Sequence, residues 1–316
     1  MKIGSIELKN NIILAPMAGV ADLPFRIVCH RFGAGLSYTE MVSAKALSFE
    51  SAKTYKLMNT ENLPTAVQLF GSDPATVAAA VPTAEKMGLF VDINMGCPAP
   101  KITGNGEGSS LMRNPVLAGE IIAAAVEAAT KPVTVKMRAG WDLEHINAPE
   151  LAEIAQKNGA AAVTVHGRTR SQFYAGSSDR NVIRQVRERI TIPLIANGDV
   201  NSGEDALSLI EETGADGVMV GRGTQGWPWI FSEIAAAFEG RPWTELPSKE
   251  RMAVAAEHIE LIVKYKGEYI GIREARKHAA WYIRGTRGAA ALREEINHAV
   301  TLEKMREILK KAIDED

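Results

Sequence analysis

The sequence predicts a (β/α)8 TIM barrel over residues 1–240, a linker over 241–247 and a small all-helical domain over 248–316. In the first part, eight short apolar runs alternate with helical patterns, which implies parallel strands joined by right-handed crossovers. Roughly 240 residues is the usual size of an eight-stranded barrel. The alternation then stops, and only helical patterns follow. An open, doubly wound sheet is the alternative fold for the first part.

The eight expected strands are β-branched or apolar runs, each followed by a turn. They cover residues 11–17, 35–41, 64–70, 89–95, 132–138, 161–167, 192–199 and 216–222. Alanine-rich amphipathic segments such as 73–88 and 114–130 lie between them and open at Asp or Asn before Pro, a typical N-cap signal. Two prolines and a tryptophan in GRPWTELPSKE interrupt the pattern. Helical patterns over 250–267, 272–285 and 293–313 complete the chain.

Composition describes an ordinary globular chain. Hydrophobic residues make up 46% and charged residues 23% of the 316 residues. Residues 1–11 lack the apolar region of a signal peptide, and no uncharged apolar run of about 18 residues predicts a membrane span. Cys29 and Cys97 form no C-x-x-C pair, which favours a reducing cytoplasm over a disulfide framework. Neither a cysteine pair nor an H-E-x-x-H pattern indicates a metal site.

A consistent set of residues, most of them polar, stands at the ends of the expected strands. In a barrel of this kind the active site lies at the C-terminal ends of the strands, so the set predicts a site there. Any one residue alone fits a solvated rim position. The set consists of Pro16, Met17, Ala18, Gln68, Asn94, Cys97, Lys136, Arg138, His166, Arg168, Asn197, Gly198, Asp199, Gly221 and Arg222.

The last two strands are followed by the glycine-containing turns ANGD and VGRGTQG. Backbone N–H groups in such turns, and the N-terminus of the helix that follows, can bind a phosphate at this position of a barrel. Residues 221–226 also read G-x-G-x-x-G, but no further βαβ unit follows, so a Rossmann site is rejected. Ordinary turn chemistry is the alternative.

One thiol stands alone at a strand end. In DINMGCPAPK, Cys97 lies between a glycine and a proline, and it is either a catalytic group at the barrel mouth, for instance a nucleophile paired with His166, or a structural residue. The loop 101–110, which contains three glycines, is a candidate lid or a plain surface loop. Cys29, inside a helical pattern, is expected to be a core residue.

Several of these segments together resemble the tRNA-dihydrouridine synthases, in particular their bacterial B-type branch. APMAGVADLPFR, DINMGCPAPK, VTVKMR, VTVHGRTR, IANGDV and VMVGRGTQGWPW stand where that family has its signature segments, and RKHAAWYIRG resembles its C-terminal helical domain. The resemblance covers essentially the whole chain. It implies a barrel that binds FMN non-covalently and uses NADPH to reduce specific uridines of tRNA to 5,6-dihydrouridine.

The resemblance also implies roles for single residues. Hydride is expected to reach C6 of uracil from FMN, and Cys97 is the expected catalytic proton donor to C5. Lys136 is expected to stabilise the anionic reduced flavin. The expected cofactor-binding residues are Pro16, Met17, Ala18, Gln68, Lys136, His166, Asn197, Gly198, Asp199, Gly221 and Arg222. Asn94, Arg138 and Arg168 are the expected substrate-binding residues of the barrel.

The C-terminal part carries a local excess of positive charge in a chain whose net charge is −2. Between Lys264 and Arg293, eight basic residues stand against two acidic ones. Such a surface is either a solvated charged face or a site that neutralises phosphates; we expect it to bind tRNA near the D-loop region, with the uridine flipped into the barrel mouth. The expected contacts are Arg273, Arg276, Lys277, Arg284 and Arg287. Trp281 is expected to pack the helices.

Two other functions fit parts of the pattern. A small-molecule FMN barrel such as a dihydroorotate dehydrogenase also uses a flavin and a pyrimidine, but it does not need the helical domain. A tRNA-binding protein without catalysis has no use for the thiol and the flavin positions. The sequence therefore predicts a cytoplasmic flavoenzyme that acts on tRNA, with no metal, no membrane and no obligate protein partner.

Overall fold

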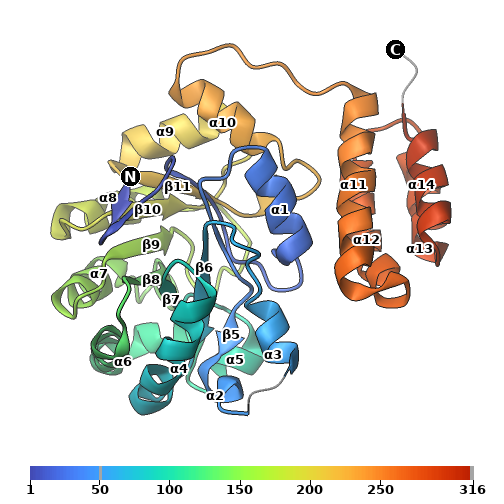
Figure 1. Ribbon diagram of the computed structural model, residues 1–316. Helices are drawn as coiled ribbons and strands as arrows, with labels where there is room; N and C mark the ends of the chain where they lie inside the picture. The colour runs from blue at the N-terminus through green and yellow to red at the C-terminus, as the bar shows by residue number, and fades with distance from the viewer. Residues whose placement is uncertain (50–51, 314–316) are drawn as a thin grey trace.

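The computed structural model describes residues 1–49 and 52–313. Eight parallel strands close into a barrel, because the last of them pairs with the first (Figure 1). In pairing order they are β3 (Ile12–Leu14), β4 (Leu36–Tyr38), β6 (Thr65–Phe70), β7 (Val91–Met95), β8 (Val133–Arg138), β9 (Ala162–His166), β10 (Leu194–Asn197) and β11 (Gly217–Val220). All eight lie inside the runs expected to be strands. The barrel prediction is confirmed, and closure excludes the open sheet.

Helices join the strands and cover the outside of the barrel (Figure 1). The two alanine-rich segments form α4 (Pro74–Met87) and α6 (Pro115–Ala128), where Asp73 and Asn114 accept N-cap hydrogen bonds. The other long helices are α1 (Leu23–Arg31), α7 (Ala148–Lys157), α8 (Arg180–Arg189), α9 (Gly203–Thr213) and α10 (Ile230–Phe238). Shorter ones are α2 (Ala44–Leu47), α3 (Ala52–Leu57), α5 (Pro100–Thr103), η1 (Gly108–Arg113) and η2 (Arg222–Thr224).

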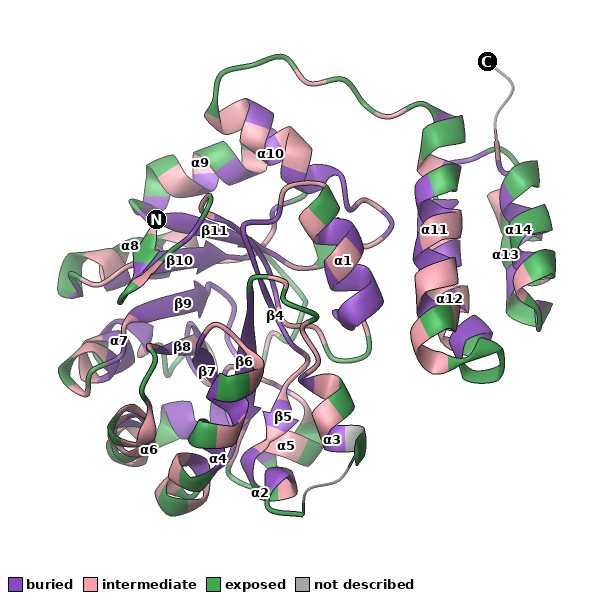
Figure 2. Ribbon diagram, viewed as in Figure 1, coloured by how far each residue is buried: buried purple, intermediate pink, exposed green. Residues whose placement is uncertain are grey.

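The strands are buried on both faces (Figure 2). Because successive side chains of a strand point to opposite faces, Ile12 and Leu14 pack with the surrounding helices, while Ile13 belongs to a separate cluster with Tyr38 and Phe90. The core therefore has an inner part, inside the barrel, and an outer part between strands and helices.

Two pieces of strand structure are not predicted by the sequence. β1 (Lys2–Ile3) and β2 (Ile6–Glu7) form an antiparallel hairpin that turns at Gly4, whose φ is 54°, and the fully buried Ile3 joins the inner cluster. β5 (Val42–Ser43) pairs with the end of β6 beyond the pairing with β4. Two-residue strands show no periodicity, so no pattern in the sequence marks them.

The C-terminal part consists of α11 (Ser248–Lys266), α12 (Glu268–Tyr282), α13 (Ala289–His298) and α14 (Leu302–Lys311), which lie beside α1 (Figure 1). We call these four helices the helical region. Their core includes two barrel residues, Val28 of α1 and Trp229 before α10. Residues 241–247, which hold no helix or strand, connect α10 to α11. No helix in the described ranges is long and apolar enough to cross a membrane.

Candidate active site at the barrel mouth

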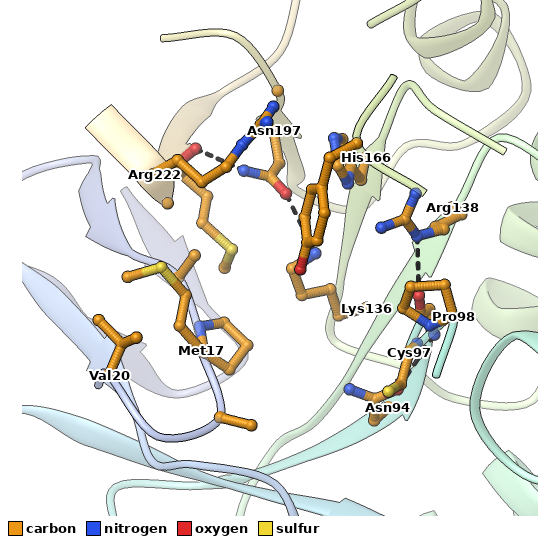
Figure 3. A pocket seen from close by; sticks show the side chains of 18 of the residues that line it. Met17, Val20, Asn94, Cys97, Pro98, Lys136, Arg138, His166, Asn197 and Arg222 are labelled. Carbon is orange, nitrogen blue, oxygen red and sulfur yellow. Dashed lines mark hydrogen bonds between the residues drawn. The ribbon is translucent and has the colours of Figure 1, made fainter. Parts of the chain in front are cut away.

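A cavity of about 410 Å³ opens at the C-terminal ends of the strands (Figure 3). Its volume falls in the range of sites that hold a small molecule or cofactor. Met17 and Val20 lie on one side of it, Asn94 and Cys97 on the opposite side, and Lys136 between them (Figure 3). A ligand in the cavity therefore meets apolar side chains on one side and the thiol on the other.

The structure brings most of the predicted site residues to this cavity. Every residue expected to bind the cofactor lines it, and so do Asn94, Cys97 and Arg138. Arg168 does not line it, and neither do the expected contacts in the helical region. The roles assigned to all these residues stay predictions.

A chain of hydrogen bonds connects the turn that carries Cys97 to β6 and β7. Asn94 Oδ1 accepts from the backbone N–H groups of Gly96 at 3.1 Å and Cys97 at 2.9 Å. Asn94 Nδ2 must then be the donor to Gln68 Oε1, at 2.8 Å. Gln68 Nε2 in turn donates to Asp92 Oδ2 at 2.7 Å. Each amide is oriented by its neighbour, so the thiol stands on a fixed turn.

Asp92 is the buried end of this chain. Its carboxylate is fully buried and also accepts from Thr134 Oγ1 at 2.6 Å. Burial raises the pKa of Asp92 to about 6, although hydrogen bonds from Thr134 and Gln68 and the charge of Lys136 oppose that shift. Asp92 is absent from the set of site residues expected from the sequence. The available signal was a single carboxylate in the middle of an apolar strand.

Lys136 is the cationic group in the middle of the site. Its Nζ donates to Asn197 Oδ1 at 3.1 Å, and Asn197 Nδ2 donates to the carbonyl of Met219 at 2.8 Å. Burial, with the neighbouring charge of Arg138, lowers the pKa of Lys136 to about 8. Burial and the charges around it also lower the pKa of His166 well below its usual range, so this imidazole is neutral at pH 7.

The loop after β10 takes a backbone shape that requires glycine at position 198. Gly198 has φ 128° and Asp199 has φ 54°, and a side chain at Gly198 would collide with Ser178. Asp199 Oδ1 accepts from Arg168 Nη1 at 2.6 Å and from Arg222 Nη2 at 3.3 Å. Arg168 is buried and serves the loop, whereas the side chain of Arg222 is 46% exposed and can reach a ligand.

Cys97 is half-buried at the edge of the cavity. Burial raises the pKa of its thiol, and the charges of Arg138 and Lys136 only partly oppose this, so the thiol is protonated at neutral pH. Arg138 fixes the turn, since its Nε donates to the carbonyl of Gly96 at 2.9 Å. No hydrogen bond in the described part of the chain joins Cys97 to His166, which leaves a nucleophilic pair without support.

The loop 101–110 supports the Cys97 turn from outside the cavity. Ser109 is buried, and its N–H and Oγ both donate to the carbonyl of Cys97, at 3.1 and 2.9 Å. Ser110 Oγ donates to the carbonyl of Thr103 at 2.8 Å. None of the residues 101–110 lines the cavity. The segment therefore holds the Cys97 turn in place, and its role as a lid stays a prediction.

Comparison with known proteins identifies the family. A model of the family described as dihydrouridine synthase (Dus) matches residues 13–316. The chain belongs to the dihydrouridine synthase family. The resemblance found in the sequence is confirmed.

Relatives of this dihydrouridine synthase family member cover most of its length. A "Probable tRNA-dihydrouridine synthase" of Rickettsia conorii is 46% identical over 302 residues, which span 94% of this chain and 91% of the relative. The "tRNA-dihydrouridine synthase B" of Vibrio parahaemolyticus is 43% identical over 301 residues, 94% of each chain. The protein of the same name from Vibrio cholerae is 42% identical over 313 residues, 98% of this chain and 97% of the relative.

A solved structure shares the fold at low sequence identity. A variant of NCR from Zymomonas mobilis matches with a TM-score of 0.55 and 15% identity, over 78% of this chain and 91% of that chain. At this identity the likeness shows the fold alone.

The basic residues of the helical region differ in what they contact. Arg276 donates to the carbonyl of Ala299 through Nε at 3.1 Å and Nη2 at 2.7 Å. The ammonium group of Lys277 donates to the carbonyl of Gly19 in the barrel. The guanidinium of Arg273 lies 3.7 Å from the ring centroid of Tyr269. Arg284 and Arg287 are exposed, as an RNA contact requires. Trp281 is half-buried, with its ring centroid 5.0 Å from that of His278.

Two aromatic residues of the site are absent from the sequence-based set. Phe173 and Tyr174 line the cavity mouth, and they are 42% and 50% exposed. The guanidinium of Arg222 lies 4.9 Å from the ring centroid of Tyr174. A pair of aromatic residues in the polar loop after the HGRTR strand end was the available signal.

Proposed function

We propose that the protein is an FMN-dependent tRNA-dihydrouridine synthase, which uses NADPH to reduce the C5=C6 bond of specific uridines in tRNA. The observation that carries the proposal is the cavity itself, in a chain of the dihydrouridine synthase family. It holds a protonated thiol on one side, a lysine in the middle and glycine-containing loops at one end.

The residues present suit a non-covalently bound flavin mononucleotide. Gly198, Gly221 and Gly223 line the cavity, and glycine-containing turns of this kind can present backbone N–H groups to a phosphate. Arg222 supplies a partly exposed positive charge beside these loops for a phosphate. Lys136 suits the electron-rich N1–C2=O edge of a flavin, and Gln68 and Asn197 place amides at the cavity wall.

When FMN is bound, its chemistry supplies the hydride that C6 of uracil accepts. Cys97 holds the proton that C5 needs and delivers it from the opposite face of the ring. The raised pKa of Cys97 keeps this proton on the sulfur near pH 7. Its backbone hydrogen bonds to Asn94 and Ser109 hold the turn in place. The positive charge of Arg138 favours the thiolate that remains.

The substrate uridine reaches the cavity only after leaving the base stack of the tRNA. The exposed Phe173 and Tyr174 at the mouth offer aromatic faces to bases beside it. Arg284 and Arg287 of the helical region offer charges to the phosphate backbone, near the D-loop region. Asn94 is the proposed contact of the uracil ring.

The same proposal gives each part of the chain a task. Residues 1–240 form the FMN-binding catalytic domain, 241–247 a linker and 248–316 the tRNA-binding domain. NADPH is the proposed electron donor, and the proposed setting is the cytoplasm, without metal or an obligate protein partner. A dihydroorotate-type activity is the alternative, because its substrate is also a pyrimidine. The helical region favours the tRNA substrate.

The experiment uses the purified full chain. It should be yellow and release FMN on denaturation. With NADPH it should form dihydrouridine in an unmodified tRNA transcript, measured by mass spectrometry of the digested nucleosides. Free uridine and dihydroorotate are the control substrates. A colourless protein that cannot be reconstituted with FMN would exclude the proposal, and so would turnover of dihydroorotate without any reaction on tRNA.

A further inference from the structure

The helical region contacts two loops that line the cavity, and α12 touches both of them. The first loop joins β3 to α1 (residues 15–22) and contributes Pro16, Met17, Ala18 and Val20 to the cavity wall. The second follows β11 and contributes residues up to Gln225. A helix that lies outside the barrel therefore touches both loops expected to receive the flavin.

The β3–α1 loop is held at Gly19 on both sides of its backbone. The N–H of Gly19 donates to Glu40 Oε1, and its carbonyl accepts from the ammonium group of Lys277. Gly19 has φ 72°, so its backbone takes a shape that glycine favours. Burial raises the pKa of Glu40, while the charges of Lys266 and Lys277 oppose the shift. Glu40 and Lys277 thus hold the two sides of the same peptide backbone at Gly19.

A second lysine of the helical region holds the end of the same loop. Lys266 Nζ lies 2.5 Å from Asp22 Oδ2 and 2.5 Å from Glu274 Oε2. Asp22 is the N-cap of α1, because its Oδ1 accepts from the N–H of Phe25 at 3.1 Å. The ring centroid of Phe25 lies 5.3 Å from that of His258 of α11. Gly19, Asp22 and Phe25 therefore connect the loop and the helix that follows it to the helical region.

The loop after β11 packs against α12 at Gly226 and at Trp229, whose ring centroid lies 6.2 Å from that of Tyr282. Gly226 has φ 76°, and a Cβ on it would lie 2.5 Å from the carbonyl of Trp281. This close packing leaves no room for the end of α12 to move toward the loop. Lys277 and Trp281 lie one turn apart on α12, so the helix joins the two loops through neighbouring positions.

We propose that Lys277 is a positioning residue for the cofactor and not a contact for RNA phosphates. It holds residues 16–20 in the shape that receives the flavin, and this inference rests on the proposed function. Its ammonium group is directed at the barrel and donates to the carbonyl of Gly19, whose N–H donates to the half-buried Glu40. The hydrogen bond fixes the ammonium group, and with it the positive charge, against the backbone of the β3–α1 loop. The helical region thereby has two proposed roles, to bind tRNA and to hold a loop of the FMN site in shape.

The test compares Lys277→Met with wild type in the full chain. The FMN dissociation constant, measured by quenching of flavin fluorescence, should rise about tenfold or more, the effect of losing a hydrogen bond from a charged donor. Lys277→Arg, which keeps a charged donor, should restore most of the affinity. Lys310→Met makes the same chemical change on the exposed face of α14 and should leave FMN binding unchanged. Glu40→Gln should weaken binding too, and its effect should not add fully to that of Lys277→Met.

A second measurement tests the mobility of the β3–α1 loop in the flavin-free protein. Hydrogen exchange of peptides that cover residues 15–22 should be faster in flavin-free Lys277→Met than in flavin-free wild type, with other peptides unchanged. Unchanged exchange and unchanged FMN affinity in Lys277→Met would overturn the proposal, as would a loss of tRNA affinity alone. If the wild-type protein bound no FMN, the proposed function would fail, while the exchange result would still decide whether Lys277 holds the loop.

Discussion

At the residue scale, Cys97 combines a raised thiol pKa with a backbone that is hydrogen-bonded on both sides. We expect Cys97→Ala to bind FMN and to accept hydride from NADPH as the wild type does. Uridine reduction should fall by roughly 10²–10⁴-fold, the usual contribution of a general acid. Single-turnover measurement of dihydrouridine formation checks this, with flavin reduction followed separately by absorbance.

The other cysteine provides the matched control. Cys29 lies fully buried in the outer core of the barrel, away from the cavity. Cys29→Ala should keep the uridine-reduction rate and lose only roughly 1 kcal/mol of unfolding free energy, because a small buried side chain is shortened. If Cys97→Ala reduced uridine at the wild-type rate, the role of Cys97 would be structural and not catalytic.

Lys136 should make FMN binding depend on pH. Its pKa in the free protein is about 8, so the ammonium group is charged below that pH and neutral above it. The charged ammonium group attracts the anionic cofactor below pH 8, and this attraction is lost as the group deprotonates at higher pH. Bound FMN raises the pKa of Lys136, so deprotonation in the complex occurs at a higher pH than in the free protein. The FMN dissociation constant should therefore increase between pH 7 and pH 9, as measured by equilibrium titration.

The matched variant is Lys136→Met, which has no titrating group at this position. Its FMN affinity should be weaker at pH 7 and nearly flat up to pH 9. His166 cannot produce the same pH dependence, because its pKa lies well below the usual range. A wild-type pH profile in Lys136→Met would assign the titration to another group.

At the scale of elements, two glycines with the same backbone requirement differ in their surroundings. Gly226 and Gly285 have φ values of 76° and 86°, but a Cβ on Gly226 meets Trp281 and one on Gly285 meets nothing within 4 Å. Gly285→Ala should cost about 1 kcal/mol of unfolding free energy, the strain of a left-handed backbone. Gly226→Ala should cost about 1–3 kcal/mol more, because α12 must shift away from the β11 loop.

Urea unfolding of both variants measures this difference. FMN affinity should fall in Gly226→Ala and stay unchanged in Gly285→Ala, because only the first glycine lies in a loop that reaches the cavity. Equal stability losses in the two variants would mean that the contact between Gly226 and Trp281 adjusts without cost.

At the scale of the whole molecule, the barrel and the helical region share a core. Val28 and Trp229 of the barrel pack with residues of α11, α12 and the helices that follow. A chain cut after Gly240 would expose these side chains to water, so tRNA binding is better tested with single substitutions in the full chain.

Arg284 offers such a substitution, because its side chain is exposed. Arg284→Ala should weaken tRNA binding and reduce the slope of log affinity against log salt by about 1, the value for one lost phosphate contact. FMN affinity should not change. Filter binding at several salt concentrations measures the slope. A slope equal to that of the wild type would place Arg284 outside the RNA interface.

Much of the architecture follows from local patterns in the sequence. All eight barrel strands lie in apolar runs, and the helices α4 and α6 begin beside Asp73 and Asn114, because strand periodicity and N-capping involve only neighbouring residues. The cavity-lining residues are predictable for a related reason. A barrel places the C-terminal ends of its strands together, so residues at those positions converge wherever the strands occur in the chain.

The tertiary structure alone decides which partners distant residues meet. Lys277 and Arg284 look alike in the sequence, but one binds the carbonyl of Gly19, 258 positions away, and the other is exposed. Asp92 looks like an anomaly in an apolar strand until Gln68 and Thr134 stand beside it. Such contacts depend on how whole elements dock, and no periodicity along the chain encodes that geometry. The sequence determined the barrel and the residues at its strand ends, while the docking of α12 determined that Lys277 contacts the β3–α1 loop.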